Sequence, residues 1–308
     1  MSTPNAIKRE LTGIAWISPW LFGFLAFMVL PIGMSIYYSL TDYPVIEAPL
    51  FVGLDNFAEL MRDEIFWLSV RNTVIYAVVS VPITTALSIG LAALVNQKLP
   101  GVGFFKAAIF VPTLVPLVAS AMIWMWLFNG ELGLINRGVM LIGLDHVLGF
   151  FVGESSYVPA WLTSASWVMV ALVLMICWSV GHPMVIYLAA MQDVPRSLYE
   201  AAEIDGAGPV RRLWNVTLPG ISPVILFNVI TATIGAWQIF AVPYIMFGDG
   251  GGPGRAAYFY TWYLYDNAFR FQRMGYASAL AWVQFLIILF FTAIIMLASR
   301  RLVHYRAT

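Results

Sequence analysis

Six long stretches without an acidic residue, lysine or arginine dominate this sequence of 308 residues. A helix needs about 20 mainly apolar residues to cross the hydrocarbon core of a bilayer, and each stretch is at least that long. Lipid leaves unpaired backbone groups unsatisfied, so only helices or closed barrels cross it, and these stretches are far too long for barrel strands. The sequence therefore predicts an all-α membrane protein with six transmembrane helices.

The charged residues between the stretches set the approximate ends of each span. We expect one transmembrane domain over residues 1–308, without a second soluble domain. Between the first two spans, Phe57, Leu60 and Met61 share one helical face, which predicts a short helix at the membrane surface. The predicted spans cover residues 13–40, 72–96, 107–129, 166–190, 222–247 and 276–299.

Lysine and arginine predict the orientation, because they are enriched in cytoplasmic loops. With the N-terminus inside, ten of the sixteen basic residues fall on the cytoplasmic side. Both termini are then cytoplasmic, and so is the segment 195–219 between the fourth and fifth spans. The first apolar run is too long for a cleaved secretory signal and lacks a small-residue cleavage site, so it is interpreted as a retained helix.

Several kinds of chemistry are disfavoured by what the sequence lacks. The three lysines Lys8, Lys98 and Lys106 do not follow glycine, so there is no phosphate-binding GxxxxGK[ST] loop. No acidic or basic residue lies deep in a span, which argues against a proton or sodium relay. His182 is more consistent with a hydrogen-bonded packing residue, and the lone Cys177 with packing inside a span. Metal ligands are not clustered, so no metal site is predicted.

The segment 195–219 is the most polar interruption of the apolar sequence. Pro195 precedes good helix formers, Gly206 permits a sharp turn, and Pro209 suits the start of a second helix. Leu218 and Pro219 are expected to end that helix before the fifth span. Two short helices at an angle, presenting the small side chains of Ala201 and Ala202, would suit the close approach of another protein.

These residues resemble the cytoplasmic EAA loop of permease subunits in binding-protein-dependent ABC importers. Glu-Ala-Ala is followed after three residues by Gly206, and after nine more by Val-x-Leu-Pro; only Val216 departs, standing where the family has isoleucine. "FVPTLVPLVASAMIWMWLFNGELGLIN" and "GLDNF" also look like the first permease of a heterodimeric pair in the carbohydrate-uptake branch, to which the maltose and glycerol-3-phosphate systems belong. The resemblance implies the type I importer fold. The residues it assigns to ATPase coupling are Glu200, Ala201, Ala202, Asp205, Gly206, Arg211, Leu218 and Pro219.

The same resemblance implies a set of partners. It predicts a second permease, two nucleotide-binding ATPase subunits and an extracellular or periplasmic solute-binding protein, around a bilayer-embedded chain without a nucleic-acid partner. ATP and magnesium would bind the partner subunits, so this chain is predicted to bind no cofactor and to catalyse no reaction. The expected location is the bacterial or archaeal cytoplasmic membrane, with the chain passing through it several times.

A neutral sugar or polyol needs hydrogen-bonding groups and aromatic faces in a mostly apolar cavity. Resemblance to the maltose permease places such contacts in three of the spans, although Leu117 and Met184 lack the polar or aromatic character of that site. Gly251, Gly252 and Pro253 are interpreted as a turn, with closure of the outer mouth as the other reading. The substrate-path candidates are Thr113, Leu117, Gly181, Met184, Trp237 and Gln238.

The sequence thus predicts half of the translocation path of an ATP-driven importer for a sugar or sugar-like solute. The alternative is an ion-coupled secondary transporter that acts without an ATPase. That class predicts inverted repeats, broken helices and charges at the middle of the membrane.

Overall fold

The computed structural model describes residues 4–97, 100–248 and 250–300, and the chain divides into two compact units. One unit comprises residues 1–63 and 264–285, and the other comprises residues 64–263 and 286–308. The two termini, which are predicted to be cytoplasmic, lie outside the described residues (1–3 and 301–308). Four helical spans are long and apolar enough to cross a membrane: Thr12–Ser39, Glu64–Val95, Ser222–Phe247 and Met274–Ser299.

The first unit begins with a continuous helical rod, α1 (Pro4–Phe24) and α2 (Leu30–Ser39), joined by a π-helical turn at Leu25–Val29. The turn directly precedes Pro31, whose ring has no N–H and crowds the preceding carbonyls, so a widened turn relieves the clash. A two-stranded antiparallel hairpin follows, β1 (Thr41–Asp42) and β2 (Leu50–Phe51).

The predicted surface helix is α3 (Asp55–Arg62), with Leu60 buried and Met61 exposed. Polar contacts tie this part of the unit to the start of α17 (Met274–Ser299). Arg273 forms an ion pair with Glu59 at 2.6 Å, and the Tyr276 hydroxyl donates to Asp63 at 2.8 Å. The first unit is therefore held at one end of its long helices by a compact, partly polar cluster.

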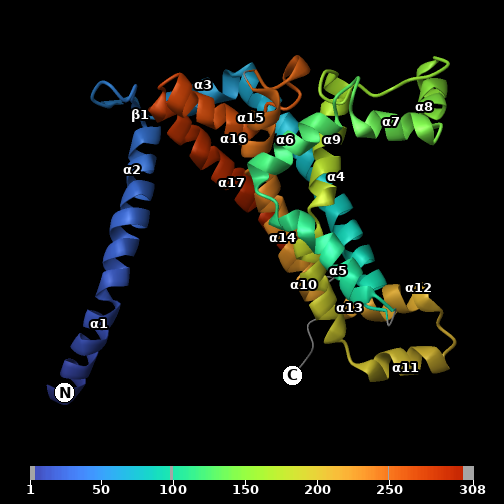
Figure 1. Cartoon of the computed structure of the whole chain (residues 1–308). Helices are drawn as coiled ribbons and strands as arrows, with labels where there is room; N and C mark the ends of the chain where they lie inside the picture. Colours follow the sequence, from blue (N-terminus) through green and yellow to red (C-terminus); the bar gives the residue numbers. More distant parts are fainter. Residues whose placement is uncertain (1–3, 98–99, 249, 301–308) are drawn as a thin grey trace. The chain divides into compact units, whose positions relative to one another are not determined.

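The second unit is built around α4 (Glu64–Val95), which begins eight residues before the predicted start of its span at residue 72. Arg71 therefore belongs to this helix. Figure 1 shows α4 beside α9 (Ala165–Trp178) and α14 (Ser222–Trp237), and both pack against it. Hydroxyl side chains along α4 donate to carbonyls three or four residues earlier, as Thr84 does to Ser80 at 2.7 Å, so they cost little in an apolar setting.

The predicted third span is a broken helix rather than a straight one. α5 (Val102–Phe110), a 3₁₀ turn (Val111–Leu114) and α6 (Leu117–Leu127) form a pair bent by 101°. Val115 is extended because proline disfavours helical geometry in the residue before it, and Pro116 then caps α6. The chain direction therefore changes between Pro112 of the 3₁₀ turn and Pro116.

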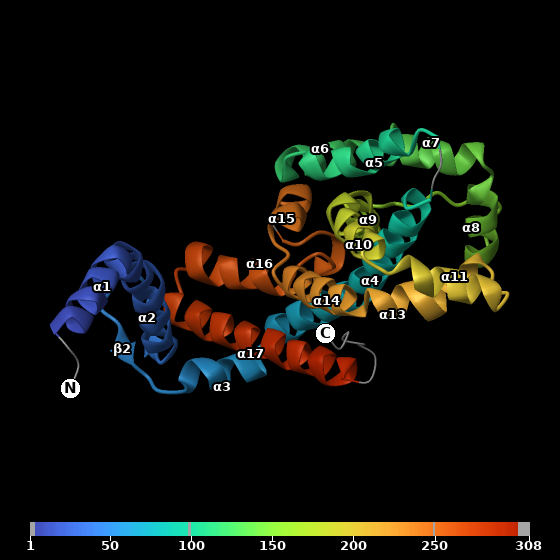
Figure 2. The same cartoon turned by 90° about the horizontal axis from the view of Figure 1, so that it is seen from below.

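The predicted fourth span is also bent. α9 and α10 (Gly181–Gln192) meet at 49°, with Pro183 in the first turn of α10, where its missing N–H breaks no bond. In Figure 2, α9 and α10 lie between α5 and α14, in agreement with their packing contacts. The fifth span breaks after Trp237 and continues as α15 (Ala241–Phe247).

Two predicted outer loops contain helices that the sequence analysis missed. Residues 130–165 hold α7 (Leu134–Leu141) and α8 (Leu144–Val152), bent by 88° at Gly143. Residues 260–270 form α16 (Tyr260–Tyr265) and a π-helical turn (Asp266–Arg270), with Tyr260 and Trp262 fully buried. Within the residues described, membrane-length helices therefore number four, or up to seven when each bent pair is one span.

Candidate functional site

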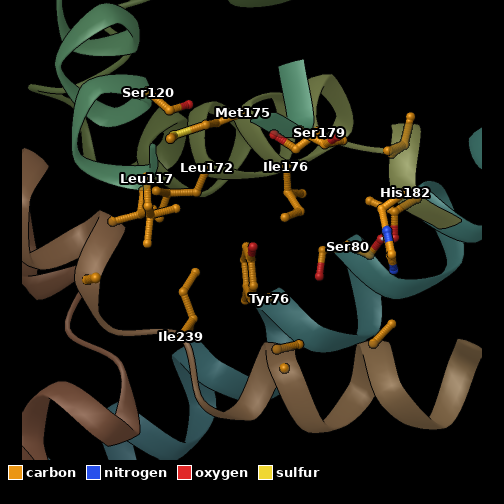
Figure 3. Close-up of a pocket in the computed structure, with 18 of the residues that line it drawn as sticks. Tyr76, Ser80, Leu117, Ser120, Leu172, Met175, Ile176, Ser179, His182 and Ile239 are labelled. Carbon is orange, nitrogen blue, oxygen red and sulfur yellow. The ribbon is translucent and has the colours of Figure 1, made fainter. Parts of the chain in front are cut away.

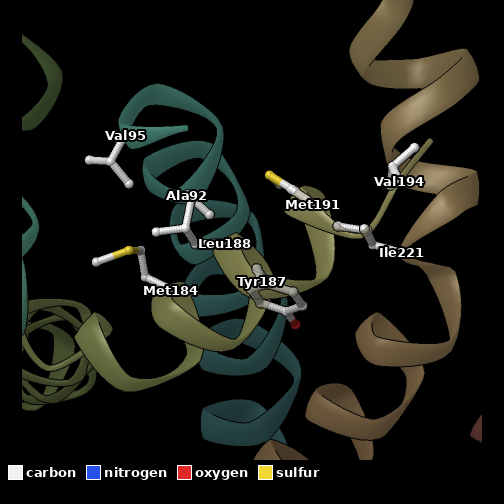
Figure 4. Close-up of a cluster of buried hydrophobic side chains, with 8 residues drawn as sticks. All are labelled: Ala92, Val95, Met184, Tyr187, Leu188, Met191, Val194 and Ile221. Atoms are coloured by element: carbon white, nitrogen blue, oxygen red, sulfur yellow. The ribbon is translucent and has the colours of Figure 1, made fainter. Parts of the chain in front are cut away.

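The segment 195–220 leaves and re-enters the helical core through one hydrophobic cluster. Val194 and Ile221, which flank the segment, are buried with Met191 and Tyr187 of α10 and with Ala92 of α4. Figure 4 shows these side chains on α4, on α10 and at the two ends of the segment. Both ends of the segment are therefore anchored on α4 and α10, while its middle projects away from them (Figure 1).

The first half of the segment is α11 (Arg196–Ile204), preceded by Pro195 as its N-cap. Gly206 follows with φ +73°, a left-handed conformation that L-residues with a β-carbon resist. The Ala207 N–H donates to the Ala202 carbonyl at 2.8 Å, and the Gly206 N–H donates to the Glu203 carbonyl at 3.0 Å. These two bonds form a Schellman motif, which ends the helix at Gly206 as the sequence predicts.

The second half starts at Pro209, also as predicted, with α12 (Pro209–Arg212). The helix ends one residue beyond the predicted Leu218 and Pro219, before the fifth span begins at Ser222. The chain continues through a π-helical turn (Leu213–Thr217) into α13 (Leu218–Gly220). Pro219 lies in the first turn of α13, where the widened preceding turn accommodates its ring and a proline is tolerated.

Two cross-links hold the halves of the segment together. The hydroxyls of Tyr199 and Thr217 lie 2.9 Å apart, and Arg212 forms an ion pair with Glu203. α11 itself has no buried residue, and Glu200 and Ala201 are exposed. The EAA residues thus stand on the free surface of a braced pair of short helices.

Large apolar side chains accompany them on that surface. Ile204, Val210 and Trp214 are 87%, 70% and 65% exposed, which is unusual for side chains in a polar loop. Asp205 and Arg211 are exposed beside them. Sequence reasoning missed Ile204 and Val210, although both interrupt otherwise polar or small residues.

A cavity of about 800 Å³ lies in the second unit among α4, α6, α9, α10 and the break after α14. Its wall is mostly apolar, and none of the described residues that line it is an acid, a lysine or an arginine. Figure 3 shows side chains from these elements pointing into the open space. The polar or aromatic lining residues are Tyr76, Ser80, Thr84, Thr113, Ser120, Ser179, His182, Gln238 and Phe240.

Comparison with known proteins identifies the class to which this chain belongs. Residues 85–305 match the family described as "Binding-protein-dependent transport system inner membrane component". A probable ABC transporter permease of Bacillus subtilis, YesP, is 35% identical over all of this chain and 96% of that protein. This chain is an ABC transporter permease subunit.

Other relatives of the permease carry names that refer to sugars. The lactose transport permease LacF of Rhizobium radiobacter is 34% identical, with 91% of each chain covered. The trehalose/maltose permease MalF of Thermococcus litoralis is 31% identical, with 95% of each covered. A bacterial alginate ABC importer chain has the same fold, with a TM-score of 0.80, 22% identity, and coverage of 96% of this chain and 98% of that one.

The permease fold and its place as a multi-pass inner-membrane component are thereby established. The secondary-transporter alternative predicts broken helices, and the bent helix pairs of this chain are broken helices. The family match nevertheless decides against that alternative, because it covers most of the chain. Broken helices are therefore a property of this permease and not a sign of ion coupling.

Three of the six substrate-path candidates line the cavity of the permease: Thr113, Leu117 and Gln238. The other three do not line it. Gly181 meets the backbone of α5, where an added β-carbon would lie 2.5 Å from the Ile109 carbonyl oxygen. Met184 is fully buried in the cluster of Figure 4, and Trp237 is buried between the rings of Tyr260 and Phe291.

His182 differs from its expected role as a packing residue. It is exposed and its side chain lines the cavity, one position beyond the buried Gly181. The sequence could not show that this side chain faces the cavity, because its direction depends on how α10 packs against α4. In the described lining it is the sole side chain that can take a positive charge.

The turn at Gly251–Pro253 is a tightly packed structure. Gly251 and Gly252 both have positive φ, and a β-carbon on Gly251 would lie 2.5 Å from the Tyr258 side chain. The Asn72 side chain of α4 donates to the Arg255 carbonyl at 2.9 Å and to the Tyr258 carbonyl at 3.2 Å. These contacts hold the turn and the residues after it against α4.

Proposed function

We propose that this permease forms half of the translocation path of an ATP-driven importer for a sugar or sugar-like solute. The observation that carries the proposal is the braced segment 195–219, whose EAA surface is exposed while both of its ends are buried in the α4–α10 cluster. A surface with these exposed apolar side chains fits a protein partner. The partner we propose is an ATPase subunit that binds the nucleotide and magnesium, so that this chain itself carries no cofactor and no catalytic group.

The arrangement of the remaining complex follows from the same proposal. A second permease would complete the path, and a solute-binding protein would deliver the solute at the outer side. One relative of known structure is described in complex with a periplasmic protein carrying an alginate pentasaccharide, which supports this assignment. We also propose six spans with both termini in the cytoplasm, made of the four long helices and the two bent pairs α5–α6 and α9–α10.

The cavity supports a neutral polyhydroxylated solute. Hydroxyl and amide groups alternate with apolar walls there, and acidic or strongly basic side chains do not occur in the described lining. Such a wall satisfies hydroxyl groups without imposing a charge preference. The names of the lactose and trehalose/maltose relatives point to the same class of solute.

The test is the substitution Glu200→Ala in the assembled transporter. Truncation of a charged side chain in a docked interface costs about 2 kcal/mol or more, so ATPase copurification should fall at least tenfold. Gln97→Ala, at an exposed position in another predicted cytoplasmic turn, is the matched control. Uptake of labelled sugars and solute-stimulated ATP hydrolysis are read in parallel. Unchanged hydrolysis and uptake in the Glu200 variant would show that this surface does not couple to an ATPase.

A further inference from the structure

The helices α7 and α8 have their apolar and polar sides reversed relative to a water-exposed loop. On α7, Asn136 is buried: it accepts a hydrogen bond from the Trp161 indole N–H at 2.6 Å and donates to the Gly130 carbonyl at 3.1 Å. On α8, Asp145 is buried and accepts from the Ser156 hydroxyl at 2.8 Å. Helices at a protein surface usually direct polar residues outward, so this pair is inverted.

The outward side of the same helices is strongly apolar. Leu141 and Ile142 are 86% and 76% exposed, and Phe150 and Phe151 are 81% and 80% exposed. Exposed apolar side chains gathered in this number mark contact with protein or membrane. The polar groups Arg137 and His146 are exposed next to them, so the apolar patch is bordered by groups that favour water or lipid headgroups.

The length of the helices excludes a simple span. With eight and nine residues, each arm is about 12–14 Å long, well short of the roughly 30 Å needed to cross the hydrocarbon core. The bend of 88° prevents the two arms from adding their lengths. Figure 1 shows α7 running across the direction of α4, near the end of α9.

We infer that α7 and α8 lie in the outer interface of the bilayer, with Leu141, Ile142, Phe150 and Phe151 inserted at the boundary between headgroups and acyl chains. Continuity favours lipid as the occupant, because the helices connect α6 to α9, two elements of the membrane-embedded helices. The bend of 88° between the two arms also favours lipid, because fluid acyl chains cover side chains on differently directed helices more readily than a single protein groove does.

This placement would give the permease a lateral support at its outer side. The inward faces are fixed by Asn136 and Asp145, and Gly149 packs so closely that a β-carbon would lie 2.6 Å from the Glu154 carbonyl oxygen. Trp161, which Asn136 binds, packs against the rings of Phe128 and Trp167, so α7 is joined to the ends of α6 and α9, while the named contacts of α8 fix it within the loop. Insertion of the outward face of the helix pair in the interface would hold the outer ends of α6 and α9 at a constant depth.

The experiment uses the assembled transporter in vesicles of phosphatidylethanolamine and phosphatidylglycerol. In a Cys177→Ser background, a single cysteine at Phe151 is labelled with the environment-sensitive fluorophore NBD. His146→Cys on the same helix, 71% exposed in its side chain but polar, is the matched control. Leu141→Cys is a second test site on the other arm, in case one variant assembles poorly.

The inference predicts blue-shifted emission at the two apolar sites, with quenching by a spin label attached to lipid near the headgroup and little quenching by aqueous iodide. The His146 site should show the opposite preference. Quenching of the apolar sites by iodide alone would place them in water. Protection of these sites from both quenchers would show that a protein covers them. Either of these two results would overturn the inference.

Discussion

Gly206 offers the sharpest test of how the exposed segment works, because the cost of replacing it is almost purely conformational. Its φ of +73° lies in the left-handed region, while a β-carbon built on it meets no atom within 4 Å. A β-branched residue there costs about 1–2 kcal/mol without any steric clash. Gly206→Val should therefore favour other turn geometries and weaken the Schellman bonds that orient α11.

The expected effect is a drop of roughly 5–30-fold in the apparent affinity for the ATPase subunits, because docking must then restore the strained turn. Titration of detergent-solubilised permease complex with purified ATPase, followed by hydrolysis rates, measures this affinity. Gly206→Asn should lose less, since asparagine tolerates the left-handed region. Gly208→Ala is the matched control, because Gly208 has a φ of −69° and free space around it. If Gly206→Val behaved like Gly208→Ala, the turn geometry would not govern docking.

Three further substitutions test the fold of the two units. Gly275→Ala should prevent normal expression, because its β-carbon would collide with the Thr41 carbonyl oxygen, whereas Gly90→Ala has free space and should be neutral; size-exclusion profiles distinguish them. Met184→Ala should destabilise the permease by about 2–5 kcal/mol in a reversible detergent-unfolding titration, since the side chain is fully buried. The hydroxyl of Ser156 lowers the pKa of Asp145. The negative charge of Asp145 therefore stabilises the loop at pH values above the ordinary pKa of about 4, and this contribution is lost as the pH falls through the lowered pKa. Limited proteolysis of loop 130–165 across that range should show a pH dependence that Asp145→Asn removes.

The exposed segment could be predicted almost completely from the sequence, because short-range chemistry determines it. Pro195 caps α11, Gly206 supplies the left-handed residue, and Pro209 starts α12, each within a few residues of its effect. The end predicted at Leu218 and Pro219 falls one residue short, because a proline is tolerated in a first helical turn. Local rules identify the position of a proline, but they do not show whether the preceding turn widens and so avoids a clash with the proline ring.

The bends of the spans and the cavity were less predictable. Apolar composition predicts that residues 107–129 enter the membrane, and Pro116 accounts for the break, yet the angle of 101° also depends on which elements α5 and α6 pack against. Likewise Gly181, His182 and Met184 lie within four positions, but only His182 faces the cavity. The direction of each side chain follows from the rotation of α10 against α4, a long-range contact that a single sequence does not reveal.

α10 connects the cavity with the exposed segment 195–220. Its first turn, with His182 and Pro183, lines the cavity, and its last turns, with Leu188 and Met191, belong to the cluster that anchors the segment 195–220. Its twelve helical residues span about 18 Å, so one short helix reaches from the cavity to the cluster. Because both ends of the segment are buried against this helix, a partner that displaces α11 must either break the cluster or move α10. Breaking it exposes several fully buried side chains, so moving α10, and with it one wall of the cavity, is the less costly response.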